Sequence, residues 1–427
     1  MVPAGKSLLL LLLLAAVPLP GFAQQSSSQQ NASGAAAPRL QPRPALPPGA
    51  SQVPRITLDV QVTDSAGRPV PGLKLSDFAV HDGGKAVQNL QLAPAGSEPT
   101  EIIFLIDPLS ADFEEIARSK QQIRNLVEKD GGKLPYSVSV AWLDLSPIKH
   151  AKGQAAPARL ISTGGPVQTV VIPIDNNRAS LHVLLASQDG MALGHAIDKA
   201  EIYPPGILAA QGAQGREQRV RLSLQALNVV ASAESERPGH KLVLWISPGW
   251  PLLNQHDDGG RQQLFNFVVA VNTELIQSRV TLFAIDPLGV TGQMNEFQSS
   301  PMSGGISSAE SAANTSAFNQ GLIASAQDGS VTPTLLAPRN VQQVKANDVG
   351  LPALALQSGG QVLAKSNDIS AELAECVAEA ASFYTLSYDA PAAKKPNEYH
   401  AIDVRVARPG LMVRTRAGYY GQPEVGH

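Results

Sequence analysis

The chain has 427 residues, a formal net charge of −3 and a pI of about 6.3. This length allows two or three folding units with a sizeable core, and the small net charge gives no reason to expect nucleic acid or an anionic membrane surface as a partner. An aromatic content of 5% argues against a carbohydrate-binding surface built from stacked rings. Cys376 is the only cysteine of the sequence, which excludes an intramolecular disulfide and a cysteine-based metal cage.

Residues 1–23 have the composition of a cleavable signal peptide. Lys6 precedes an unbroken leucine run, two prolines follow that run, and Gly21-Phe22-Ala23 supplies small residues before a cut. The apolar run is shorter than the roughly 20 residues that a transmembrane helix needs. We therefore expect cleavage after Ala23 and export to the periplasm or the exterior. No later segment has the length and apolarity of a membrane span, and a large disulfide-free exported chain is more natural for a bacterial envelope.

Two short regions follow the signal peptide. Residues 24–54 are rich in Gln, Ser, Ala and Pro, which predicts a disordered linker. Residues 55–95 predict a small β module, because Ile56–Val62 alternates apolar and polar residues and Phe78–Val80 forms a second short apolar segment.

Residues 100–382 change to buried strands that alternate with amphipathic helices. Continuous apolar runs of this kind predict strands that are covered on both faces; they lie at 102–106, 138–143, 170–174, 242–246 and 280–285. Helix-period segments lie between several of these runs, so we predict a doubly wound, mostly parallel α/β sheet. Residues 290–339 are rich in Gly, Ser, Ala, Asn and Gln and predict a flexible insertion.

Residues 383–421 predict further strands. Pro409-Gly410 separates the last two apolar segments and suggests that they form a β-hairpin. We expect this hairpin to extend or cap the central sheet.

Several short motifs recur together in the order typical of one family. They are Val62-Thr63-Asp64 with Gly67, Asp77-Phe78, Asp82-Gly83, Ser247-Pro248-Gly249, Phe283–Asp286, Ser358–Gly360, Phe383–Tyr388 and Arg416–Tyr420. In this order they resemble the VWFA-related domain proteins described from Acidobacteria. The resemblance implies a Rossmann-like von Willebrand factor A-type domain, whose members mainly bind other macromolecules.

The resemblance also implies a metal-ion-dependent adhesion site. Typical members hold Mg²⁺ through an Asp-x-Ser-x-Ser loop, a Thr on a second loop and an Asp on a third. Here Asp107 matches the first Asp, but Leu109 and Ala111 occupy the two serine positions and Ser110 is out of step by one residue. Met191 stands where the Thr would be.

The third loop departs from the pattern as well, because Ser247 is followed by Pro248 where the family has its Asp. One good ligand out of five is too few for Mg²⁺, which gives up its water reluctantly. We therefore expect a degenerate site without a bound cofactor. If a divalent cation binds at all, its candidate ligands are Asp107, Ser110 and Asp257.

Further polar residues fall at the carboxyl ends of predicted strands. His256-Asp257-Asp258 follows the strand at 242–246, at the edge where open α/β folds place their ligands. It is either a substitute binding site or a solvated loop, and the loop is the commoner case. Ser247 lacks the glycine two positions earlier that a hydrolase nucleophile elbow requires, which argues against a catalytic serine.

Asp107 and Asp286 each follow an apolar strand in the sequence Ile-Asp-Pro-Leu. Paired carboxylates at strand ends are a pattern for general acid–base catalysis. The alternative is that Asp before Pro ends a strand and accepts backbone N–H bonds. The sequence shows no accompanying His, Ser or Lys set, so we favour the structural role.

These patterns together predict an exported, non-enzymatic module that binds a protein partner through loops at the carboxyl edge of its sheet. The candidate binding-loop residues are Asp107, Ser110, Met191, Ser247, His256, Asp257 and Asp258. The alternatives are a structural or scaffolding role in the envelope, or an enzyme that uses Asp107 and Asp286.

Overall fold

The computed structural model describes residues 55–94, 98–145, 167–206, 212–235, 237–249, 258–287, 337–344, 348, 350–363, 369–380 and 382–423. The predicted signal peptide and linker, and all of the predicted insertion 290–339 except its last three residues, lie outside these ranges. No described helix has the length and apolarity needed to cross a membrane.

The described part of the chain has a mixed α/β fold whose centre is a seven-stranded sheet in the order β11-β10-β9-β5-β6-β8-β7. Its strands are β5 (Thr100–Ile106), β6 (Lys133–Asp144), β7 (Thr169–Ile174), β8 (Ala179–Asp189), β9 (His240–Ile246), β10 (Val280–Ile285) and β11 (Val362–Leu363). The five strands from β11 to β6 are parallel, and β8 pairs antiparallel with both β6 and β7. The apolar runs of the sequence form the central strands, where almost every side chain is buried.

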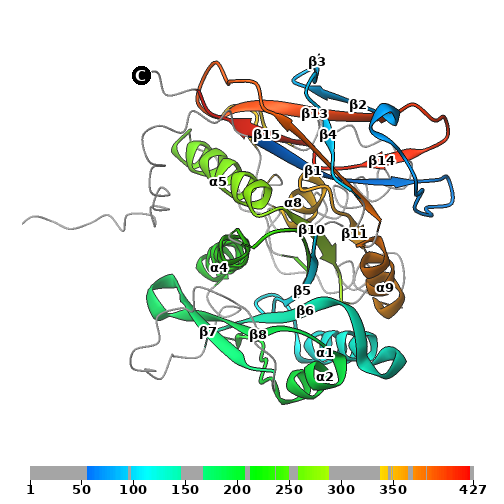
Figure 1. The fold of residues 1–427 in the computed structure, drawn as a ribbon. Helices are drawn as coiled ribbons and strands as arrows, with labels where there is room; N and C mark the ends of the chain where they lie inside the picture. Colours follow the sequence, from blue (N-terminus) through cyan, green and yellow to red (C-terminus); the bar gives the residue numbers. More distant parts are fainter. Residues whose placement is uncertain are drawn as a thin grey trace, which may run out of the picture. The chain divides into compact units, whose positions relative to one another are not determined.

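Helices cover both faces of this sheet (Figure 1). On one face lie α1 (Phe113–Val127), α2 (Gly190–Lys199) and α9 (Ile369–Glu379). On the other lie α4 (Gly212–Glu234), α5 (Asp258–Gln277) and α8 (Leu351–Gln357). Cys376 is buried in α9 against the sheet.

The segments at the two ends of the described chain form a β-sandwich together (Figure 1). One sheet has the order β14-β1-β12-β4 and the other β15-β13-β2-β3. The strands are β1 (Arg55–Thr63), β2 (Phe78–Asp82), β3 (Lys85–Ala86), β4 (Gln91–Leu92), β12 (Phe383–Asp389), β13 (Glu398–Val406), β14 (Met412–Arg414) and β15 (Gly418–Gly421). Their inner faces share one apolar core, in which Leu58 of β1 and Leu386 of β12 are fully buried.

The sandwich corrects two expectations. The β strands of 55–95 do not form a module by themselves, because β1 pairs with β12 and β2 pairs with β13. The expected hairpin at Pro409-Gly410 is also wrong, since the strands on either side of it belong to different sheets: β13 pairs with β15 and β2, whereas β14 pairs with β1. These last strands therefore complete the sandwich, and none of them pairs with a strand of the seven-stranded sheet.

The sandwich core also contains a buried polar group that orients two of its tyrosines. The carboxylate of Asp82 accepts hydrogen bonds from the hydroxyls of Tyr388 and Tyr419 at 2.9 and 2.8 Å, and its other oxygen lies 2.8 Å from Nδ1 of His400. Because a buried carboxylate is costly without partners, these bonds explain why Asp82 is tolerated in an apolar core. The His400 bond also links β2 to β13.

Candidate functional site

The strand order of the seven-stranded sheet reverses between β5 and β9. The chain leaves β5 through α1 on one face and reaches β6, whereas it leaves β9 through α5 on the other face and reaches β10. A crevice at the carboxyl ends of the strands on either side of such a reversal is where open α/β sheets place ligands. Asp107 follows β5 here and Ser247 follows β9.

Asp107, Ser247 and Asp286 lie in one row at this edge. The preceding residues are in register across the three strands, because Ile106 pairs with Ile246 and Ile246 pairs with Ile285. The structure therefore brings three of the residues noted in the sequence to the same level of the sheet.

Asp107 is enclosed by donors from its own chain. Its side chain is 1% exposed, one carboxylate oxygen accepts the Ser223 hydroxyl at 2.8 Å and the Trp245 indole N–H at 3.3 Å, and the other accepts the Leu109 backbone N–H at 3.0 Å. Burial raises the pKa of Asp107, and these three hydrogen bonds act in the opposite direction. Its oxygens are thus committed to joining β5 to α4 and β9.

Ser247 and the hydroxyl of Ser110 are also buried at this edge. Ser247 is 3% exposed, donates its backbone N–H to the Ile285 carbonyl, and accepts the backbone N–H of Gly249 on its hydroxyl at 3.0 Å. The hydroxyl of Ser110 is buried and has no hydrogen-bond partner among the described residues. Ser247 therefore forms a turn after β9 together with Pro248 and Gly249.

Met191 does not belong to this edge, and the prediction that it occupies the second ligand loop is wrong. β8 runs antiparallel to β6, and its end pairs with the start of β6 through Asp189 and Lys133. Met191, two residues later, lies against Gly132, where an added Cβ would come within 2.7 Å of the Met191 nitrogen. The loop is consequently at the amino ends of the parallel strands, opposite Asp107, because the preceding strand reverses the chain.

The predicted cluster His256-Asp257-Asp258 is described only in part. His256 and Asp257 lie outside the described residues, and Asp258 is the first residue of α5, with its side chain not described. Among the residues that the structure does describe, no group of three His, Cys, Asp or Glu side chains is arranged to hold a metal ion.

The structure does not unite Asp107 and Asp286 in one acid–base pair. β9 separates their strands, which puts them about 10 Å apart by the usual strand spacing. Asp107 is held on α4, whereas the charge of Asp286 acts on Glu115 of α1, on the other face. Burial is the main cause that raises the pKa of Glu115, and the nearby carboxylates add to it. Glu115 closes a capping box with Asp112 at the start of α1.

Three residues of this edge were not singled out in the sequence. Ser223 and Trp245 hold Asp107, and Phe113 begins α1 with 67% of its surface exposed. The signal for Ser223 is a polar residue between two buried leucines of a long helix. The signal for Phe113 is its position directly after the N-cap residue Asp112. Apolar residues of α1 become buried only later in the helix, from Ile116 onward.

The opposite edge, at the amino ends of the parallel strands, carries a buried charge cluster. Arg237 forms ion pairs with Glu101 and with Glu234, and Lys241 donates to the Arg237 carbonyl. Burial, reinforced by the charge of Glu234, raises the pKa of Glu101 to about 7, and burial lowers the pKa of Lys241 to about 8. The cluster links the amino ends of β5 and β9 to the end of α4.

Comparisons with known proteins identify no family. No family model matches the chain, and no curated protein matches it. Among solved structures it is similar to the crystal structure of the human COPII-coat protein Sec24c, with 10% sequence identity and a TM-score of 0.28. The match covers 84% of this chain and 49% of that chain, so this chain spans about half the length of its match. A TM-score this low does not show a shared fold.

Proposed function

We propose that this chain is an exported, non-enzymatic module that binds a protein partner at the carboxyl edge of an A-type α/β sheet without a bound metal. Two features support the A-type, doubly wound arrangement. The strand order reverses between β5 and β9, and helices pack on both faces of the sheet. The export rests on the composition of residues 1–23.

The enclosure of Asp107 carries the metal-free part of the proposal. In a metal site this aspartate is ionised and faces solvent, where it shares a cation with water molecules. Here Ser223, Trp245 and the Leu109 N–H fill the positions that a cation would need, and burial raises the pKa of the carboxyl. The acid therefore acts as a structural acceptor that fixes the ends of β5 and β9.

Phe113 supports the binding part of the proposal. It is 67% exposed and begins α1, a few residues beyond Asp107 at the same edge. Exposed aromatic side chains on a rigid element are typical anchors of protein interfaces. The capping box of Asp112 and Glu115 holds this first turn of α1 in place, so the ring is presented on a fixed backbone.

The experiment is an affinity capture from the envelope and culture medium of the source organism, with purified chain as bait. We expect Phe113→Ser to lose the proteins that the wild type retains. The matched control is Met412→Ser, which removes a 45% exposed apolar side chain from β14 of the sandwich and should retain them. Equal capture by both variants, or no specific protein with the wild type, would contradict the proposal. Saturable binding of one partner separates recognition from a general scaffolding role.

A further inference from the structure

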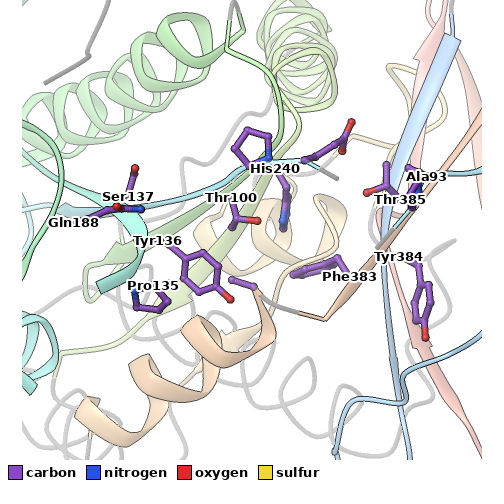
Figure 2. A pocket seen from close by; sticks show the side chains of 14 residues that line it. Ala93, Thr100, Pro135, Tyr136, Ser137, Gln188, His240, Phe383, Tyr384 and Thr385 are labelled. Carbon is purple, nitrogen blue, oxygen red and sulfur yellow. The ribbon is translucent and has the colours of Figure 1, made fainter. Parts of the chain in front are cut away.

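A cavity of about 410 Å³ lies at the amino ends of β5, β6 and β9, on the side of the sheet opposite to the proposed binding edge. Its wall is completed by β12 of the sandwich and by the end of α9 (Figure 2). The volume falls within the range of small-molecule sites, which runs from roughly 300 to 1,000 Å³.

His240 lines this cavity, and one nitrogen of its buried ring is unpartnered in the described part of the chain. The residue is 4% exposed, its Nε2 lies 3.1 Å from the Thr281 hydroxyl and 3.9 Å from the carboxylate of Asp59, and its Nδ1 has no hydrogen-bond partner among the described residues. Asp59 is ion-paired with Arg279 and is therefore ionised. Its negative charge near Nε2 favours the His240 tautomer that carries the ring hydrogen on Nε2. Nδ1 is then a buried acceptor, and such groups are costly when unpaired.

Apart from Glu98 and His240, the polar side chains that line the cavity are uncharged: they are those of Thr100, Tyr136, Ser137, Gln188, Tyr384 and Thr385. Thr100, Tyr136 and Ser137 line it, and none of their hydroxyls bonds to another side chain or to the backbone within the described part of the chain. Burial raises the pKa of Tyr136, so its hydroxyl is a donor at neutral pH. Burial also lowers the pKa of His240, so the imidazole is neutral there.

The remaining surface of the cavity is apolar or neutralised. Phe383 lies edge-on to the His240 ring, with 4.3 Å between the ring centroids, and Pro99 and Pro135 extend this apolar wall. Glu98 is the one lining residue, among those described, that carries a formal charge at neutral pH, and it is paired with Arg279 at 2.5 Å. The wall thus gives no unpaired charge to attract an anion or a cation.

We propose that this cavity binds an uncharged, hydroxylated small molecule of the sugar or polyol class. One ligand hydroxyl donates to Nδ1 of His240, others exchange hydrogen bonds with Thr100 and Tyr136, and an apolar C–H face packs on Phe383. The rings of Tyr136 and Phe383 suffice for a single site, so the low aromatic content of the chain does not oppose it. The ligand contacts strands of both the α/β sheet and the sandwich, and therefore stabilises the junction between them.

The test uses the full mature chain and a panel of glucose, galactose, N-acetylglucosamine and inositol. Saturation-transfer NMR detects binding, and calorimetric titration measures its dissociation constant. We expect at least one compound to bind saturably with a constant below about 10 mM. Tyr136→Phe and Thr100→Val each remove one hydroxyl and should weaken binding about five- to tenfold. Tyr203→Phe removes a hydroxyl from an exposed tyrosine outside the cavity and should leave binding unchanged.

A spectroscopic measurement places the ligand independently of folding effects. With ¹⁵N-labelled histidine, the bound sugar should shift the Nδ1 resonance of His240 and leave those of His195 and His400 in place. The proposal is overturned if no compound of the panel binds below about 10 mM, if the two cavity variants bind as the wild type does, or if the His240 resonance does not respond to a compound that binds. None of these results bears on partner capture through Phe113.

Discussion

Replacing Asp107 by alanine should destabilise the protein strongly, because three buried donors lose their acceptor at once. The Ser223 hydroxyl, the Trp245 indole N–H and the Leu109 N–H all point at this carboxylate, which is 1% exposed. A buried polar group left unpaired costs about 1–3 kcal/mol. Some of the three can rotate or find water, so we expect a loss of about 3 kcal/mol in the free energy of unfolding for Asp107→Ala.

A variant of one donor measures how much that donor contributes to the loss in the free energy of unfolding. Ser223→Ala removes one donor and leaves the carboxylate with two, so we expect a loss of about 1 kcal/mol. In the double variant the serine no longer needs an acceptor, and the combined loss should be smaller than the sum of the two single losses by roughly 1 kcal/mol.

The assay is urea unfolding followed by tryptophan fluorescence and circular dichroism, with the slope against urea compared among variants. Ser235→Ala is the matched control, since it removes a serine hydroxyl that bonds to the Ser232 carbonyl at an exposed position just after α4. The reasoning is refuted if Asp107→Ala unfolds within about 0.5 kcal/mol of the wild type, or if the losses of the double variant are strictly additive. Either result would mean that the buried donors around Asp107 do not depend on its carboxylate.

Four further predictions concern other parts of the fold. The pKa of Glu101 is raised to about 7 from 4.5, so the folded chain holds an extra proton and its stability should fall by on the order of 2 kcal/mol from pH 4.5 to 7; Glu101→Gln should flatten this limb in unfolding titrations. The pKa of Lys241 is lowered to about 8 from 10.5, so stability should rise again between pH 8 and 10.5, and Lys241→Met should remove that rise. Tyr388→Phe leaves one oxygen of Asp82 short of a donor and should cost about 1–2 kcal/mol in urea unfolding, whereas a cost below about 0.3 kcal/mol would contradict this role. A peptide of residues 55–95 should show no β signal by circular dichroism until a peptide of residues 383–423 is added, and a folded isolated 55–95 peptide would contradict the sandwich pairing.

The local elements were largely readable in the sequence. The continuous apolar runs at 102–106, 242–246 and 280–285 became β5, β9 and β10, because a strand covered on both faces leaves no polar alternation. The spacing of Leu373, Cys376 and Val377 is typical of one apolar helix face, and this segment forms α9 with Cys376 buried.

The pairing of distant strands was not readable. The alternation in Ile56–Val62 indicates one buried face, but it does not say that β12, far along the chain, provides the other sheet edge. The same limit explains the error at Pro409-Gly410: the turn was recognised correctly, with Gly410 at a φ of +78°, yet the strands beside it found partners elsewhere.

The candidate site shows a similar division. The position of Asp107 at the end of β5 follows from the sequence, but its partners do not, since Ser223 and Trp245 come from elements more than a hundred residues away. Met191 was misplaced because β8 was not recognised as a separate antiparallel strand, and one missed reversal moves a loop to the opposite edge of a sheet.

The most direct test of metal-free binding at the carboxyl edge is partner capture with and without chelator. Wild-type chain should retain the same partner in EDTA as in Mg²⁺, and Phe113→Ser should lose that partner in both conditions while Met412→Ser keeps it. Capture that disappears in EDTA and returns with Mg²⁺, and that does not depend on Phe113, would contradict the account.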